Sequence, residues 1–197
     1  MISKILEVPY HSQLGTITCG AACVKMAVET IGGSTDTVAV IFTETEDSEW
    51  GGSSPEKVAG TLKERGGQPA ATVVVASATG TNAEDELIRR MIWSIHDAGV
   101  PAIALVALDE ESFTGDGHWV VVAGYHADRH PTGPDDMKCV VTAFEFSNPM
   151  KAAGDQTYPN HVGYKWWRRR YMKSVGSRHE DYAGSVVAVA GGTLGSA

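Results

Sequence analysis

The sequence predicts an α+β fold in which N-terminal helices pack on an antiparallel β-sheet. Amphipathic helical patterns crowd the first half of the chain, and runs of β-branched and aromatic residues follow in the second half. Strands and helices do not alternate, which argues against βαβ units and a parallel sheet. The 197 residues suit one domain, which we expect over residues 1–190, followed by a flexible tail at 191–197.

Three segments of the first half have the spacing of amphipathic helices. The first begins at Cys19, places apolar or small residues at i, i+3, i+4 and i+7, and ends at Gly32-Gly33. The second begins after Ser54 and ends at Gly66-Gly67. The third has candidate caps at 81–82 and the clearest apolar stripe, which consists of Leu87, Ile88, Met91, Ile92 and Ile95.

The pattern changes after residue 100. Four segments rich in Val, Ala, Ile and aromatic residues are bounded by Gly, Pro or Asp and are predicted to be strands: 101–108, 118–125, 139–146 and 185–190. Residues 164–171 have helical spacing, with aromatic side chains on one face and arginines beside them. We interpret these arginines as a solvated helix face rather than a site for nucleic acid or lipid.

The composition argues against several classes of protein. Sixteen basic and 24 acidic residues give a net charge of −8, whereas a nucleic-acid binder needs a basic surface, so no nucleic-acid partner is expected. No apolar run approaches the roughly 20 residues of a membrane span, and charge interrupts the N-terminus, which therefore lacks a secretory signal pattern. Three cysteines, an odd number, argue against a disulfide framework. We therefore expect a cytoplasmic protein.

Cys19 stands at the predicted start of the first helix, after a loop that contains Gly and Thr. The positive end of the helix dipole and the unpaired backbone N–H groups at this position favour a thiolate, the nucleophilic form of cysteine. The backbone N–H of Cys19 would face an oxyanion formed at the sulfur, and the side-chain amide of Gln13 could supply a second donor. The alternative interpretation is a buried small residue and a loop amide without a chemical role.

Two later segments carry the other candidate groups. His118 opens a strongly apolar predicted strand, and a histidine has the pKa suited to accept a thiol proton near neutrality. Another predicted strand leads to Asn148-Pro149, where Asn148 can accept a hydrogen bond from the imidazole and fix its tautomer. Taken singly, His118 fits a strand-end histidine bonded to a backbone carbonyl, and Asn148-Pro149 is a turn signal.

Together these residues resemble the C39-like branch of the papain-like cysteine hydrolases, bacterial peptidases related to the leader-processing domains of bacteriocin transporters. The resemblance covers roughly residues 5–190 and depends on four motifs in a fixed order. The motifs are Val-Pro-Tyr-x-x-Gln at 8–13, Cys-Gly-Ala-Ala-Cys at 19–23, Gly-His-Trp-Val-Val-Val at 117–122 and Asn-Pro at 148–149. Many relatives carry Asp where this chain has Asn148, and the chain contains no Walker-type loop.

The resemblance implies a papain-like fold and a cysteine peptidase or amide hydrolase without a cofactor. Cys19 would be the nucleophile, His118 the general base and then the acid, and Asn148 the residue that orients the imidazole. Gln13 would be an oxyanion donor. The substrate would be a peptide or protein, cleaved through a thioester that water resolves, and leader-peptide cleavage after Gly-Gly is what the family suggests.

Two other functions stay open at this point. A catalytically silent papain-like domain would bind a peptide in the same groove. An acyltransferase or peptide cyclase would pass the same thioester to an amine instead of water. The sequence fixes neither the substrate and its cleavage preference nor the oligomeric state.

No metal site is predicted. Cys23 follows Cys19 by one helical turn, which is poor spacing for zinc, and we interpret Cys23 as a core residue. One predicted loop has metal-binding side chains at irregular spacing: His126, Asp128, His130, Asp135 and Asp136. An acidic loop lacks the glycine and the final glutamate of a calcium loop and contains Glu44, Glu46, Asp47 and Glu49.

Overall fold

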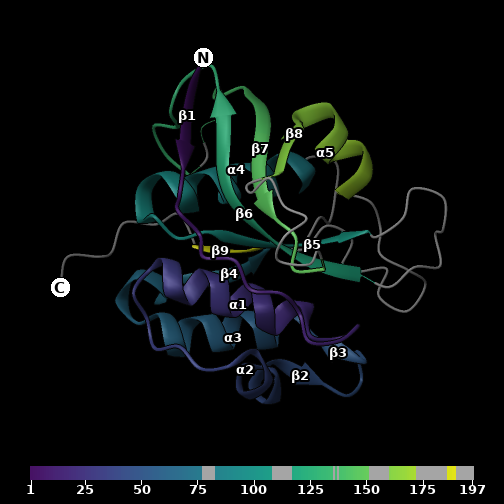
Figure 1. Ribbon diagram of the computed structural model, residues 1–197. Coiled ribbons are helices and arrows are strands. Elements are labelled where there is room, and N and C mark those ends of the chain that lie inside the picture. The colour runs from purple at the N-terminus through teal and green to yellow at the C-terminus, as the bar shows by residue number, and fades with distance from the viewer. Residues whose placement is uncertain are drawn as a thin grey trace.

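In the described part of the chain, seven strands form an antiparallel sheet at the centre of the protein (Figure 1). The structure is a computed structural model that describes residues 1–76, 83–107, 117–134, 136, 138–150, 160–171 and 186–189. The strand order is β4-β9-β5-β6-β7-β8, and β1 pairs with β6. The strands are β1 (Ile2–Ile5), β4 (Val73–Ala76), β5 (Ala102–Ala107), β6 (Gly117–Ala127), β7 (Val141–Ser147), β8 (Asn160–Gly163) and β9 (Val186–Val189).

Helices cover both faces of this sheet (Figure 1). One face packs against α1 (Cys19–Thr30), α2 (Val38–Thr45) and α3 (Pro55–Gly66). The other packs against α4 (Ala83–Trp93), which continues into a π-turn at Ser94–Ala98, and against α5 (Tyr164–Tyr171). A short hairpin, β2 (Glu46–Asp47) and β3 (Gly52–Ser53), lies between α2 and α3 in the chain.

The long strand β6 divides its side chains between the two cores. Val121 and Ala123 pack into the core below α1, whereas Val120 and Val122 pack into the core below α4 and α5. This division follows from the two-residue period of a strand, and it explains why β6 is an almost continuous apolar run. β6 is also long enough to pair with β7 on one side and with β5 and then β1 on the other.

The predicted α+β class is confirmed, and the predicted helices begin or end within a few residues of α1, α3, α4 and α5. The four predicted strands correspond to β5, β6, β7 and β9. The predicted elements do not include β1, α2, the hairpin of β2 and β3, β4 or β8. The candidate caps Thr81 and Asn82 and the predicted tail at 191–197 lie outside the described residues, and the single domain over 1–190 stays a prediction.

Two predicted loops were placed wrongly. His126 lies within β6, because that strand extends past Tyr125 to Ala127. The acidic segment is not one loop, because Glu44 belongs to α2 while Glu46 and Asp47 form β2. No helix in the described part of the chain has both the length and the hydropathy needed to cross a bilayer.

Candidate active site

Cys19 is the first residue of α1 and is buried. Thr18, which precedes the helix, makes no side-chain cap, because its hydroxyl accepts hydrogen bonds from the backbone N–H groups of Leu14 and Gly15 and closes the preceding loop. The first N–H groups of the helix are therefore not capped by this side chain. Backbone N–H groups of Cys19, Gly20 and Trp119 are close enough to the thiol to lower the pKa of Cys19.

The position of Trp119 brings the start of β6 to this sulfur. Trp119 packs in the same core as α1, and its indole N–H donates to the backbone oxygen of Ser53 at 2.9 Å. Gly20 permits this approach, because a Cβ at Gly20 would lie 2.5 Å from Cβ of Ser53 and 3.2 Å from Cδ1 of Trp119. The backbone N–H of Trp119, the residue that follows His118, is thus among the groups that lower the pKa of the Cys19 thiol.

The protonation of the thiol differs from what the helix position alone predicts. Burial raises the pKa of Cys19, and the three N–H groups at the sulfur lower it by less. Their contribution has the direction expected for a helix N-terminus, but desolvation of a thiolate in this buried position is the larger effect. The isolated thiol is therefore neutral at neutral pH and needs a base to become a nucleophile.

His118 and Asn148 form a direct hydrogen bond. The Nε2 atom of His118 lies 2.8 Å from Oδ1 of Asn148, which also accepts from the backbone N–H of Met150 at 2.9 Å. The Met150 bond identifies this atom of the amide as the acceptor, so the proton of the neutral imidazole is on Nε2 and its lone pair on Nδ1. Burial lowers the pKa of His118, and the bond to Asn148 partly opposes that shift.

The loop before α1 is fastened to the turn that carries Asn148. The backbone N–H of Gln13 donates to the backbone oxygen of Pro149 at 2.9 Å. The Tyr10 hydroxyl lies 3.4 Å from the backbone oxygens of both Asn148 and Pro149. The predicted site residues therefore belong to three chain segments that lie together: the loop before α1, the start of β6 and the turn after β7.

Gln13 is held less favourably for the predicted role. Its side-chain nitrogen donates to the backbone oxygen of Gly15 at 2.6 Å, so the loop itself takes one of the two hydrogens of the amide. Its Oε1 atom is buried and has no hydrogen-bond partner among the described residues. An unpaired buried acceptor costs about 1–3 kcal/mol.

The other cysteines differ from Cys19 in their surroundings. Cys23 is fully buried in the core below α1, and burial raises its pKa well above the ordinary value. Cys139 is half-buried, precedes β7, and donates from its thiol to the backbone oxygen of Arg129 at 3.2 Å. A cavity of about 1130 Å³ lies beside α4, β7, β8 and α5, and none of the four predicted site residues lines it.

Comparison with known structures identifies the class of fold. The chain is similar to a double-glycine motif protease from an AMS/PCAT transporter, solved in complex with the leader peptide, with a TM-score of 0.52 and 11% identity over 96% of this chain and 100% of that one. It is also similar to the peptidase domain of Streptococcus ComA, a bi-functional ABC transporter involved in a quorum-sensing pathway, with a TM-score of 0.54 and 11% identity over 93% of this chain and 100% of that one. These likenesses show the papain-like fold of C39 peptidase domains.

The family follows from the sequence itself. Residues 5–175 match the model of the Peptidase_C39 like family, and the chain belongs to that family. A search of the curated proteins found no match. Membership of the family supports a peptidase role.

Proposed function

We propose that the protein is a cysteine peptidase or amide hydrolase in which Cys19 is the nucleophile, His118 the base and Asn148 the residue that orients the imidazole. The observation that carries the proposal is the 2.8 Å hydrogen bond from Nε2 of His118 to Asn148, together with the Cys19 sulfur beside the N–H of Trp119. Family membership supports the same reaction class.

The reaction begins with a neutral thiol and a neutral imidazole. Nδ1 of His118 accepts the Cys19 proton as the sulfur attacks the carbonyl carbon of the substrate. The backbone N–H of Cys19 donates to the oxyanion, and the Gln13 amide donates as well once a hydrogen is turned toward it. The imidazolium then protonates the leaving amine, and water hydrolyses the thioester and regenerates the thiol.

The substrate we propose is a peptide or protein, and leader-peptide cleavage is the candidate process. Support comes from the structural neighbour solved in complex with a leader peptide and from the family match.

Mass spectrometry of a diverse peptide library tests the proposal. Wild-type protein and the Cys139→Ser variant should yield the same new products, and Cys19→Ala should yield none. Cys139→Ser is a matched control, because it also removes a thiol but from a half-buried position before β7. Identical product spectra from wild type and Cys19→Ala would remove the enzymatic proposal.

Alkylation separates an active hydrolase from a silent peptide-binding domain. With His118 as base, iodoacetamide should modify Cys19 faster than Cys23 or Cys139 near neutral pH, and His118→Gln should abolish the difference. Equal slow labelling of all three cysteines would favour the silent domain. Transfer of the acyl group to an added amine instead of water would indicate an acyltransferase or cyclase.

A further inference from the structure

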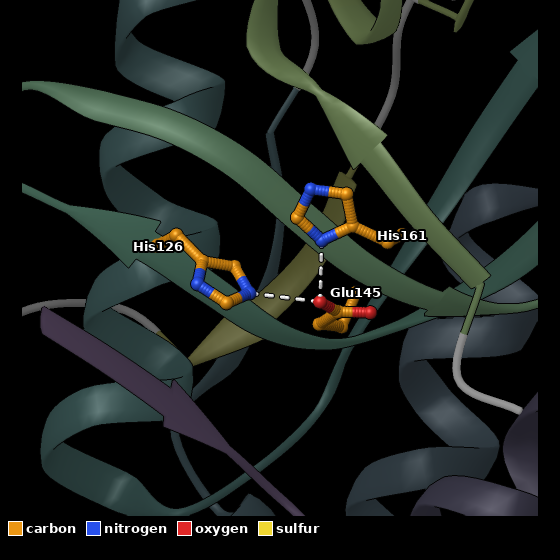
Figure 2. Close-up of side chains that lie close together, drawn as sticks. All are labelled: His126, Glu145 and His161. Carbon is orange, nitrogen blue, oxygen red and sulfur yellow. Dashed lines mark hydrogen bonds and ion pairs between the residues drawn. The ribbon is translucent and has the colours of Figure 1, made fainter. Parts of the chain in front are cut away.

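Three side chains with metal-binding atoms meet on one face of the sheet (Figure 2). His126 comes from β6, Glu145 from β7 and His161 from β8. Glu145 pairs directly with His161 across β7 and β8, and it pairs with Gly124 across β6 and β7, two residues before His126. Since alternate residues of a strand share a face, this register places all three side chains together.

Both imidazoles point at the same carboxylate oxygen (Figure 2). Nε2 of His126 lies 2.8 Å and Nδ1 of His161 lies 2.6 Å from Oε1 of Glu145. The three ligand atoms lie within 4.8 Å of one another, and the two rings are edge to face with centroids 5.0 Å apart. Ligands at about 2.1 Å from a tetrahedral zinc ion are about 3.4 Å apart, so small side-chain rotations would admit an ion.

The charge around Glu145 favours a cation. Its side chain is 8% exposed, and a buried carboxylate is costly unless a positive charge accompanies it. Among the described residues, its side-chain partners are the two imidazoles, each of which donates an N–H to the carboxylate and brings no positive charge in its neutral form. A second histidine–glutamate pair among the described residues, His11 with Glu29, differs because Lys25 supplies a permanent positive charge to Glu29 at 2.5 Å.

We propose that His126, Glu145 and His161 bind one zinc ion, with a water molecule as the fourth ligand. Two imidazoles and one carboxylate are a donor set that zinc accepts, whereas calcium and magnesium prefer oxygen ligands alone. The His161 side chain is 58% exposed, which gives the ion a path from solvent. The ion would join β6, β7 and β8, and would thereby hold the four-residue strand β8 to the sheet.

Zinc titration against a chromophoric chelator tests this site. The protein is stripped of metal and carries Cys19→Ala, so that the thiol of the candidate active site does not bind the ion. We expect one zinc per chain, with the affinity reduced about tenfold or more by Glu145→Gln and by His161→Ala. His11→Ala is the matched control, because it removes a histidine paired with a glutamate outside the cluster, and it should leave the affinity unchanged.

Thermal unfolding gives a second measurement that does not depend on activity. Zinc should raise the midpoint of the Cys19→Ala protein relative to chelator, and the rise should disappear in His161→Ala, whose exposed side chain is removed without opening the core. Failure of the Cys19→Ala protein to bind zinc at micromolar concentrations would overturn the proposal. Equal affinity in all variants would overturn it as well. Neither result would affect the proposed peptidase, since the site shares no residue with it.

Discussion

The imidazole of His118 is subject to two opposing effects that set its pKa. Burial lowers the pKa, and the hydrogen bond to Asn148 raises it by less, so the ring is neutral at neutral pH and can accept a proton. Asn148→Asp would put a negative charge at the same hydrogen-bond distance and stabilise the imidazolium. We expect the acidic limb of the kcat/KM profile to move to higher pH by about one unit or more.

Removing the hydrogen bond at Asn148 should shift the pKa of His118 in the opposite direction. Asn148→Ala removes the bond that raises the pKa of His118, so the acidic limb should move to lower pH while kcat falls because the ring is no longer oriented. Ring chemical shifts of His118, followed by NMR across the same pH range, measure the pKa without a substrate. An unchanged pKa in Asn148→Asp would contradict this account of the pair.

The candidate catalytic side chains could be predicted from the sequence, because their order along the chain is informative. Cys19, His118 and Asn148 each sit at the end of a recognisable element, so their proximity could be anticipated. The effect of Trp119 on Cys19 could not be anticipated, because it comes from a backbone N–H, which almost every residue carries. His161 was missed as well, because its contact with Glu145 depends on the register between β7 and β8, which the sequence pattern does not specify.

At the scale of elements, the first turn of α1 is positioned by the absence of a side chain at Gly20. A Cβ there would lie 2.5 Å from Cβ of Ser53. Because Cβ of Ser53 is attached directly to the backbone of β3, it cannot move away without moving the strand. Gly20→Ala should therefore move α1 away from β3 and β6 and lower the free energy of unfolding by about 1–3 kcal/mol. It should also slow alkylation of Cys19, whose sulfur would leave the N–H of Trp119.

Gly60 provides the matched control for this prediction. It is exposed in the middle of α3, and a Cβ there would meet no atom within 4 Å. Gly60→Ala should raise the free energy of unfolding by about 0.5–1 kcal/mol, because alanine favours the helix. Urea unfolding of both variants measures the two signs. Destabilisation of equal size at both positions would show that contact with Ser53 is not the cause.

Most of the elements that the sequence predicted have long apolar patterns. α1, α3, α4, β5, β6 and β7 bury several residues each, so their periodicity is visible. β1 and β8 are four residues long and alternate half-buried with exposed positions, so they carry little hydrophobic signal. β4 was missed although its run Val73-Val74-Val75 is as apolar as β9, which was predicted; the period of so short a run does not separate a strand from a helix.

In the molecule as a whole, burial and ion pairing shift several pKa values, and the direction of each shift sets the pH range in which the group stabilises the fold. The folded state lowers the pKa of His118 and His96 by burial, and the pKa of Glu44 through its hydrogen bond with Arg65. A pKa that is lower in the folded than in the unfolded chain contributes stability above the unfolded value, and that stability is lost as the pH falls. Burial raises the pKa of Cys19 and Cys23, so stability should also decline as the pH rises above their ordinary value.

Acidification should therefore lower the free energy of unfolding in two stages: first below the ordinary histidine pKa of about 6.5, then below the ordinary glutamate pKa of about 4.3. The net charge of −8 complicates the first stage, because neutralisation toward the pI of about 5.3 relieves repulsion and adds stability. A comparison of wild type with His118→Gln isolates the contribution of this imidazole, because the relief of charge repulsion on acidification is nearly the same in both proteins. Urea unfolding in the presence of chelator at several pH values should show a smaller loss between pH 7 and pH 5 in His118→Gln than in wild type. Equal losses in both proteins would mean that protonation of the buried imidazole does not oppose folding, and the neutral His118 on which the proposed chemistry depends would lose its physical basis.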